Sequence, residues 1–204
     1  MTSQNGIERY IDDLFTKPSY FLEIGAWDSE HYSQTAWLER ERAWEGLCVD
    51  PFPYNFQDRA CLLCRKGISI DGKPREFVRV GTDRRHGGDV SYLSGFADTI
   101  QLHWKTIEEH CNYERVLVET LTFEQLCREY NVPDYIGLLS VDTEGSELEV
   151  FKGIDFSRYS FGMVTFEHNF DWVKRDSISN ILKSNGYILY HEFEYDDIWI
   201  DEKL

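Results

Sequence analysis

Apolar positions along the chain alternate between two spacings. Between residues 6 and 16 they fall at 7, 10, 11, 14 and 15, the spacing of a helix with one buried face. Short unbroken apolar runs, of which 135–141 is the most continuous, instead predict strands buried on both faces. Helices are expected at 6–16, 34–43, 122–130, 146–152 and 172–185. Strands are expected at 21–25, 46–50, 60–70, 76–80, 115–119, 135–141, 161–166, 187–193 and 195–200.

Three stretches in the middle of the chain are less regular. Asp71-Gly72 predicts a hairpin turn between the strands at 60–70 and 76–80. Residues 81–95 are rich in Gly, Asp, Arg and Ser without periodicity, which indicates either a loop over an active site or a plain surface loop. Residues 100–110 fit a helix or a loop equally well.

Alternation of strands and helices predicts an α/β fold with a doubly wound, mainly parallel sheet and helices on both faces. The last two strands are expected to pair antiparallel. A chain of 204 residues is the size of one substantial domain, so we expect a single domain over 1–204. In such a fold, ligands bind beyond the carboxyl ends of the strands.

Composition narrows the classes of partner. No apolar run approaches the roughly 18 residues of a membrane span, and no signal peptide is recognisable, so we expect a cytoplasmic protein without a membrane partner. A net charge of −16 without a basic cluster argues against nucleic acid. The odd number of cysteines argues against a complete set of disulfides and predicts free thiols. Cys61-x-x-Cys64 is not expected to bind zinc, because no second pair of ligands follows it.

Acidic residues follow the predicted strands at four places. They are Glu23 to Asp28, Asp50, Asp142 with Glu144, and Glu167 with His168 and Asn169. Gly25 ends the first strand, and Asp50 lies some way beyond this glycine. An acid about twenty residues beyond such a glycine turn is placed to accept hydrogen bonds from a ribose. This pattern fits both dinucleotide-binding oxidoreductases and methyltransferases, although the G-x-G-x-x-G of the former is absent.

Several motifs resemble the FkbM family of methyltransferases over about residues 20 to 190. They are Phe-Leu-Glu-Ile-Gly-Ala-Trp-Asp-Ser from 21, Gly-Leu-Cys-Val-Asp-Pro from 46, Asp-Thr-Glu-Gly-Ser-Glu-Leu-Glu-Val from 142, and Glu-His-Asn from 167. The resemblance implies a class I fold with a seven-stranded sheet. It also implies methyl transfer from S-adenosylmethionine to a hydroxyl of a sugar, glycan or related natural product, so that the partner is a small-molecule or glycan acceptor.

The same resemblance implies roles for individual residues. The predicted cofactor contacts are Glu23, Gly25, Ala26, Ser33, Asp50 and Asp142, with Asp50 on the ribose hydroxyls. Asp28-Ser29 departs from the Asp-Gly that is frequent in the family.

Methyl transfer to oxygen requires a hydroxyl that is aligned with the methyl group and deprotonated. Asp142 and His168 are the predicted catalytic residues. Asp142, Glu167 and His168 also resemble the metal positions of catechol-type methyltransferases, which implies a divalent cation such as Mg²⁺ or Mn²⁺. Alternatively, Asp142 and Glu144 cap the following helix and Glu167 accepts from a loop amide.

Further side chains are candidates for the site. His31, His86, His103 and His110 could lie there or on the surface, and Tyr92, Trp104 and Trp172 could form an aromatic platform for a sugar ring. Two other functions remain open at this point. They are a dinucleotide-binding oxidoreductase and a non-catalytic binding module built on a methyltransferase fold.

Overall fold

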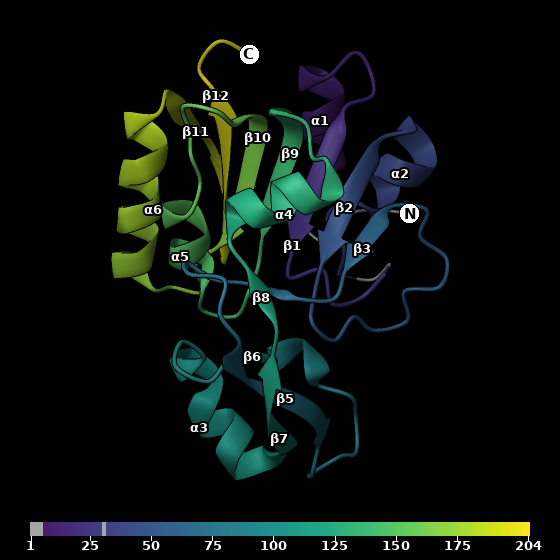
Figure 1. Cartoon of the computed structure of the whole chain (residues 1–204), viewed down its shortest axis with the longest axis vertical. Coiled ribbons are helices and arrows are strands. Elements are labelled where there is room, and N and C mark those ends of the chain that lie inside the picture. Colours follow the sequence, from purple (N-terminus) through teal and green to yellow (C-terminus); the bar gives the residue numbers. More distant parts are fainter. Residues whose placement is uncertain (1–5, 30–31) are drawn as a thin grey trace.

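The computed structural model describes residues 6–29 and 32–204, which form a large sheet between helices and a smaller lobe (Figure 1). The seven-stranded sheet has the order β11-β12-β10-β9-β1-β2-β3. Its strands are β1 (Tyr20–Ile24), β2 (Glu45–Val49), β3 (Leu62–Cys64), β9 (Tyr135–Val141), β10 (Ser160–Glu167), β11 (Tyr187–Glu192) and β12 (Asp196–Asp201). From β3 to β10 neighbouring strands are parallel, whereas β12 is antiparallel to both β10 and β11. The predicted doubly wound sheet with an antiparallel last pair is confirmed.

Helices cover both faces of this sheet, as predicted. On one face, α1 (Glu8–Leu14) and α2 (Ala36–Arg42) bury Ile11 and Leu38 against β1 and β2. On the other face lie α4 (Phe123–Tyr130), α5 (Glu147–Lys152) and α6 (Trp172–Ser184), which contribute to the larger apolar core. None of the helices in the described ranges is long and apolar enough to cross a membrane.

The smaller lobe corrects the prediction for the middle of the chain. The strand expected at 60–70 is divided into β3 and β4 (Gly67–Ile68), and β4 pairs with β8 (Thr120–Leu121). The hairpin through Asp71-Gly72 was wrong, because β5 (Arg75–Asp83) pairs with β6 (Gly95–Phe96) and β7 (Cys111–Val118). Those partners lie far along the chain, and local turn chemistry cannot reveal them.

Two ambiguous stretches are resolved within this lobe. Residues 101–110 form a helix, α3 (Gln101–His110), which buries Ile107 against the lobe's own small core. The stretch at 81–95 holds the end of β5 and the short 3₁₀ helix η1 (Ser91–Leu93). It also lines the cavity described below, so it is more than a plain surface loop.

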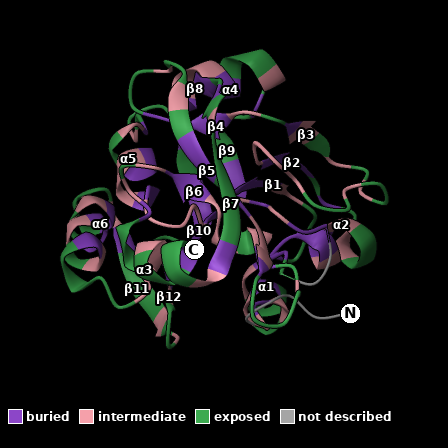
Figure 2. Cartoon of the chain, turned by 90° about the horizontal axis from the view of Figure 1, so that it is seen from below, coloured by how far each residue is buried: buried purple, intermediate pink, exposed green. Residues whose placement is uncertain are grey.

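The lobe lies beyond the carboxyl ends of the central strands, and from below its strands β5 and β7 cross in front of the sheet (Figure 2). Arg75 of the lobe contacts Glu149 of α5 at 2.7 Å. Gly145, in the loop before α5, lies so close to the lobe that a Cβ there would be 2.4 Å from the carbonyl oxygen of Thr99. The lobe is thus packed directly on the loop after β9.

Candidate functional site

A cavity of about 830 Å³ lies between the carboxyl ends of the central strands and the lobe. Strands β1, β2, β9 and β10 contribute the residues at or just beyond their ends, and the lobe contributes β5, η1 and α3. Among the residues predicted for the site, the lining includes Gly25, Ala26, Asp50, Asp142 and Glu167. The topology therefore brings together side chains that are more than a hundred positions apart in the sequence.

Gly25 stands where β1 turns into the cavity wall. Its N–H donates to the carbonyl oxygen of Val49 at 2.8 Å, and its φ of +87° is one that glycine adopts without strain. A Cβ at this position would lie 1.5 Å from the carbonyl oxygen of Asp142. The strand ends approach so closely that no larger residue fits.

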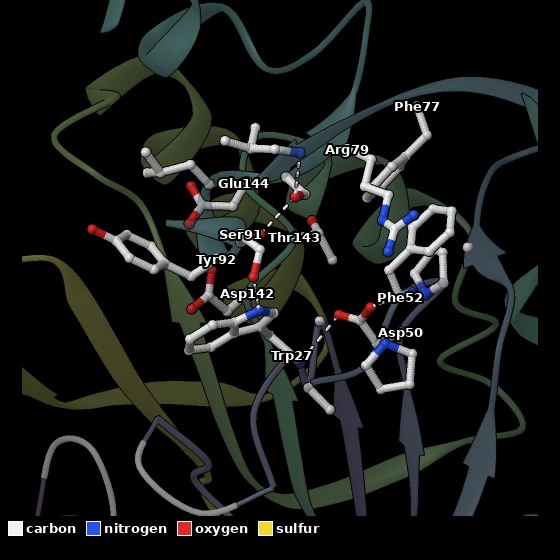
Figure 3. A pocket seen from close by; sticks show the side chains of 18 of the residues that line it. Trp27, Asp50, Phe52, Phe77, Arg79, Ser91, Tyr92, Asp142, Thr143 and Glu144 are labelled. Atoms are coloured by element: carbon white, nitrogen blue, oxygen red, sulfur yellow. Dashed lines mark hydrogen bonds between the residues drawn. The ribbon is translucent and has the colours of Figure 1, made fainter. Parts of the chain in front are cut away.

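Asp50 presents its carboxylate at the end of β2. Oδ2 accepts from the N–H of Trp27 at 3.1 Å and Oδ1 from the N–H of Phe52 at 2.7 Å (Figure 3). Burial raises the pKa of Asp50 from 3.8 to about 6, and these two hydrogen bonds oppose part of the rise. Each oxygen keeps a further lone pair for a ligand donor such as a ribose hydroxyl.

Beside Asp50 the cavity is apolar. Phe52 and Phe77 lie with ring centroids 5.6 Å apart, and Ile68 and Phe96 complete this part of the wall. The guanidinium of Arg79 lies over the Phe52 ring at 4.7 Å. A flat apolar heterocycle would find suitable walls here, next to the acid that suits a ribose.

Three carboxylates meet on the other side of the cavity. Oxygens of Asp142, Glu144 and Glu167 lie within 4.8 Å of one another. Burial raises the pKa of Asp142 well above its usual range, and the charges of Glu167 and Glu144 add to the rise. Burial likewise raises the pKa of Glu167 to about 8, with a further contribution from Glu144. These acids therefore keep their protons to a higher pH than exposed carboxyl groups do.

The loop that carries these acids is held by a buried glutamate from α5. Glu147 Oε1 accepts from the N–H groups of Thr143 and Gly145, both at 2.9 Å, and Oε2 accepts from Lys174 Nζ at 2.5 Å. The helix-capping role considered for Asp142 and Glu144 is not observed, because no described side chain caps the start of α5. Asp142 and Glu144 are left facing the cavity.

Glu23 and Ser33 do not line the cavity, which corrects their prediction as direct cofactor contacts. Side chains alternate along β1, so Glu23 points to the face that carries α2. There it accepts from Ser33 Oγ at 2.9 Å, the Gln34 N–H at 2.7 Å and Thr35 Oγ1 at 2.6 Å. These contacts shape the loop between β1 and α2 instead of binding a ligand directly.

His168 is also placed away from the cavity, so its prediction as catalytic base and metal ligand was wrong. Its side chain is 1% exposed, and its Nε2 lies 3.9 Å from Asp197 Oδ1. Its Nδ1 accepts from the Phe170 N–H at 3.2 Å, and burial lowers its pKa. The side chain of Glu167 reaches the cavity from the last position of β10, whereas that of the next residue turns into the protein.

Of the remaining histidine candidates in the described residues, one lines the cavity and two lie outside it. His103 on α3 lines the cavity, and its Nε2 lies 3.0 Å from Glu144 Oε2, a contact that raises the pKa of His103. His86 is 61% exposed beside Asp83, and His110 stands at the last position of α3 outside the lining. His31 lies outside the described residues.

Of the aromatic residues predicted as a platform, Tyr92 alone reaches the cavity. Trp104 packs on Tyr113 within the lobe, and Trp172 packs on His168. The rings that accompany Tyr92 are Trp27, Tyr32 and Tyr54, which were not among the residues predicted for the site. The signal was the position of Trp27, immediately after the Gly25-Ala26 turn.

Comparison with known proteins identifies one family. A family model described as the methyltransferase FkbM domain matches residues 23–189. None of the curated proteins matches the chain. Among solved structures, a precorrin-6y C5,15-methyltransferase from Geobacter metallireducens GS-15 covers 98% of this chain and 90% of its own, with 13% identity and a TM-score of 0.40. At that TM-score the likeness carries no argument about activity.

Proposed function

The chain belongs to the FkbM-domain methyltransferases, which use S-adenosylmethionine, and we propose that it methylates a hydroxyl of a sugar, glycan or related natural product. One observation carries the cofactor half of this proposal. The Gly25 turn, the Asp50 carboxylate and the apolar wall around Phe52 follow one another along the same cavity. They match in order the amino-acid, ribose and adenine parts of the cofactor.

The acceptor half rests on the opposite side of the cavity. Beyond the Gly25 turn, toward β9 and β10, the lining changes to Asp142, Glu144 and Glu167. In the cofactor orientation proposed above, this is the side that would receive the methyl group. A carboxylate here would accept the proton of the acceptor hydroxyl, whose oxygen would take the methyl group that the bound cofactor supplies. Asp142, adjacent to the Gly25 turn, is the residue proposed for this step.

A divalent cation at this side remains a prediction from the sequence, with a changed set of ligands. Asp142, Glu144 and Glu167 offer the oxygen ligands that Mg²⁺ and Mn²⁺ accept, and Asp142 Oδ1 is buried without a hydrogen-bond partner among the described residues. A bound cation would lower the pKa of the acceptor hydroxyl. Calorimetric titration with Mn²⁺ checks this. We expect the unaltered protein to bind the ion and Glu167→Gln to lose that binding, and equal heats from the two proteins would contradict the site.

Two measurements test the proposed function. Calorimetry with S-adenosylhomocysteine should give a one-to-one complex, and the same titration with NADH should give none, which separates the methyltransferase from the oxidoreductase. Incubation with a labelled methyl donor and a panel of saccharides should then yield a labelled methyl ether, detected by mass spectrometry after hydrolysis. Cofactor binding without transfer to any hydroxyl compound would leave the non-catalytic binding module as the better description.

A further inference from the structure

A group of aromatic rings lies at the mouth of the cavity and belongs to none of the described apolar cores. This aromatic subsite consists of Trp27, Tyr32, Tyr54 and Tyr92. The rings come from three separate segments, namely the loop after β1, the segment after β2, and η1 in the lobe. None of these residues is part of the clusters that stabilise the sheet or the lobe. Their packing therefore calls for an explanation other than the core.

Trp27 is the fixed centre of the aromatic subsite. Its indole N–H donates to Ser91 Oγ at 2.9 Å, and its backbone N–H donates to Asp50 (Figure 3). Tyr54 stacks on it with centroids 5.4 Å apart and ring planes at 15°, and Tyr92 contacts it edge-on at 5.6 Å. Since the same residue bonds to the proposed ribose acid, the subsite directly adjoins the cofactor part of the cavity.

The tyrosines around Trp27 keep much of their surface open. Tyr32, Tyr54 and Tyr92 are 52%, 46% and 40% exposed, although Tyr32 and Tyr92 stack on each other at 6.0 Å. Aromatic surface left in water at the mouth of a cavity gains free energy when a ligand with an apolar face covers it. Each of these residues also keeps a phenolic hydroxyl for hydrogen bonds.

Charge in the cavity restricts what that ligand can be. The described lining carries six acidic side chains and no Lys or Arg beyond Lys66 and Arg79; the acids are Asp50, Asp89, Glu114, Asp142, Glu144 and Glu167, and burial raises the pKa of Asp142 and of Glu167. Within the described lining, its Lys and Arg side chains already face carboxylates: Arg79 contacts Glu114 at 3.0 Å, and Lys66 contacts Glu129 at 3.2 Å. A phosphate or a nucleoside diphosphate would meet the ionised acids of this lining without a free Lys or Arg among the described lining residues to offset them, unless a divalent cation is bound.

From these observations we infer that the aromatic subsite binds an uncharged saccharide ring of the acceptor and disfavours phosphorylated or nucleotide-linked sugars. A pyranose presents C–H groups to the aromatic faces and directs its hydroxyls outward, toward Ser91 and the carboxylates. A phenol would use the aromatic faces but leave most of these polar groups unmatched. The inference rests on the proposed function and adds where the acceptor binds and what charge it carries.

The test compares acceptors and variants under saturating methyl donor. Neutral methyl glycosides should be methylated, and the phosphates of the same sugars should show a kcat/KM at least tenfold lower. Tyr32→Ala and Tyr92→Ala should each raise KM for the glycoside by about fivefold to tenfold, the range of one lost aromatic contact. Their affinity for S-adenosylhomocysteine should stay unchanged, which shows that the cofactor part of the site is intact.

Tyr190→Ala is the matched control, because Tyr190 is also 40% exposed and packs edge-on against one ring, Tyr10, outside the cavity lining. It should leave KM unchanged. If glycosides are methylated but Tyr32→Ala and Tyr92→Ala keep the normal KM, or if sugar phosphates react better, the inference fails while the proposed function stands. If phenols alone are methylated, the saccharide assignment fails. If no hydroxyl compound reacts although the cofactor analogue binds, the proposed function fails and the inference with it.

Discussion

At the scale of single residues, Gly25 lets two strand ends meet at the wall of the cavity proposed for the cofactor. Its positive φ and its contact with the Asp142 carbonyl leave no room for a Cβ. We expect Gly25→Ala to abolish S-adenosylhomocysteine binding. It should also lower the free energy of unfolding by about 1–2 kcal/mol for the left-handed conformation and about 1–3 kcal/mol for the steric overlap.

Denaturant unfolding and calorimetry measure the two effects separately. Gly87→Ala is a suitable control, because Gly87 also has a positive φ, +73°, but nothing lies within 4 Å of a Cβ placed there. It should lose only the conformational part of the stability and keep cofactor binding. Unchanged binding in Gly25→Ala would contradict the assignment of this turn to the cofactor.

The burial of Asp50 should make cofactor binding depend on pH. In the free protein its pKa is raised to about 6, so the carboxylate is ionised above that pH and protonated below it. Ribose hydroxyls donate to the ionised form and therefore lower this pKa when the cofactor binds. The dissociation constant of S-adenosylhomocysteine should be flat above about pH 6 and rise by up to about tenfold per unit as the pH falls below it.

Asp50→Asn separates this effect from other groups that titrate in the cavity. It should weaken binding by about 1–3 kcal/mol at neutral pH, the scale of a hydrogen bond to a charged group. The rise below pH 6 should also become shallower. Calorimetry from about pH 5 to about pH 8 gives both the loss of affinity at neutral pH and the slope of the dissociation constant at low pH. Identical pH profiles in the two proteins would show that Asp50 does not hold the ribose.

At the scale of elements, the loop between β9 and α5 depends on the buried pair of Glu147 and Lys174. Glu147 is fully buried and holds two backbone N–H groups as well as the ammonium group. Glu147→Gln leaves the buried charge of Lys174 unpaired, so we expect a loss of about 3–5 kcal/mol in the free energy of unfolding.

The comparison for this prediction is Glu129→Gln. Glu129 forms an exposed ion pair with Lys66, which contributes about 0–1 kcal/mol at most. Urea unfolding of both variants at neutral pH gives the two values. A loss in Glu147→Gln no larger than that in Glu129→Gln would mean that the loop is held by other contacts.

At the scale of the whole molecule, a cofactor bound in the cavity would link the sheet and the lobe, because residues of both line it. A ligand that binds only the folded protein adds about 2.7 kcal/mol at a hundred times its dissociation constant. For a chain of this size this corresponds to a rise in Tm of roughly 5–10 °C. Thermal denaturation should show such a rise with S-adenosylhomocysteine and none with NADH. The reverse result would favour the oxidoreductase.

Much of the large sheet could be predicted from local patterns. The apolar runs around Leu22, Leu47 and Leu139 are long enough to identify buried strands, and Thr122 begins α4 with the capping box expected of a helix start. The strand pairing of the lobe was harder to predict from the sequence, because β5 pairs with β6 and β7 through residues far apart in the chain. Its strands are also partly exposed, which weakens the apolar signal.

The sequence by itself determined the family, the parallel sheet and the acidic strand ends, because residue type and spacing along the chain carry that information. Which side chains share the cavity was decided by the tertiary structure alone. Alternation along β1 turns Glu23 away, and the end of β10 separates Glu167 from His168. The folding of the lobe over the strand ends then selects His103 and Tyr92 from the open candidates, because it places these two in the cavity and leaves Trp104 outside it.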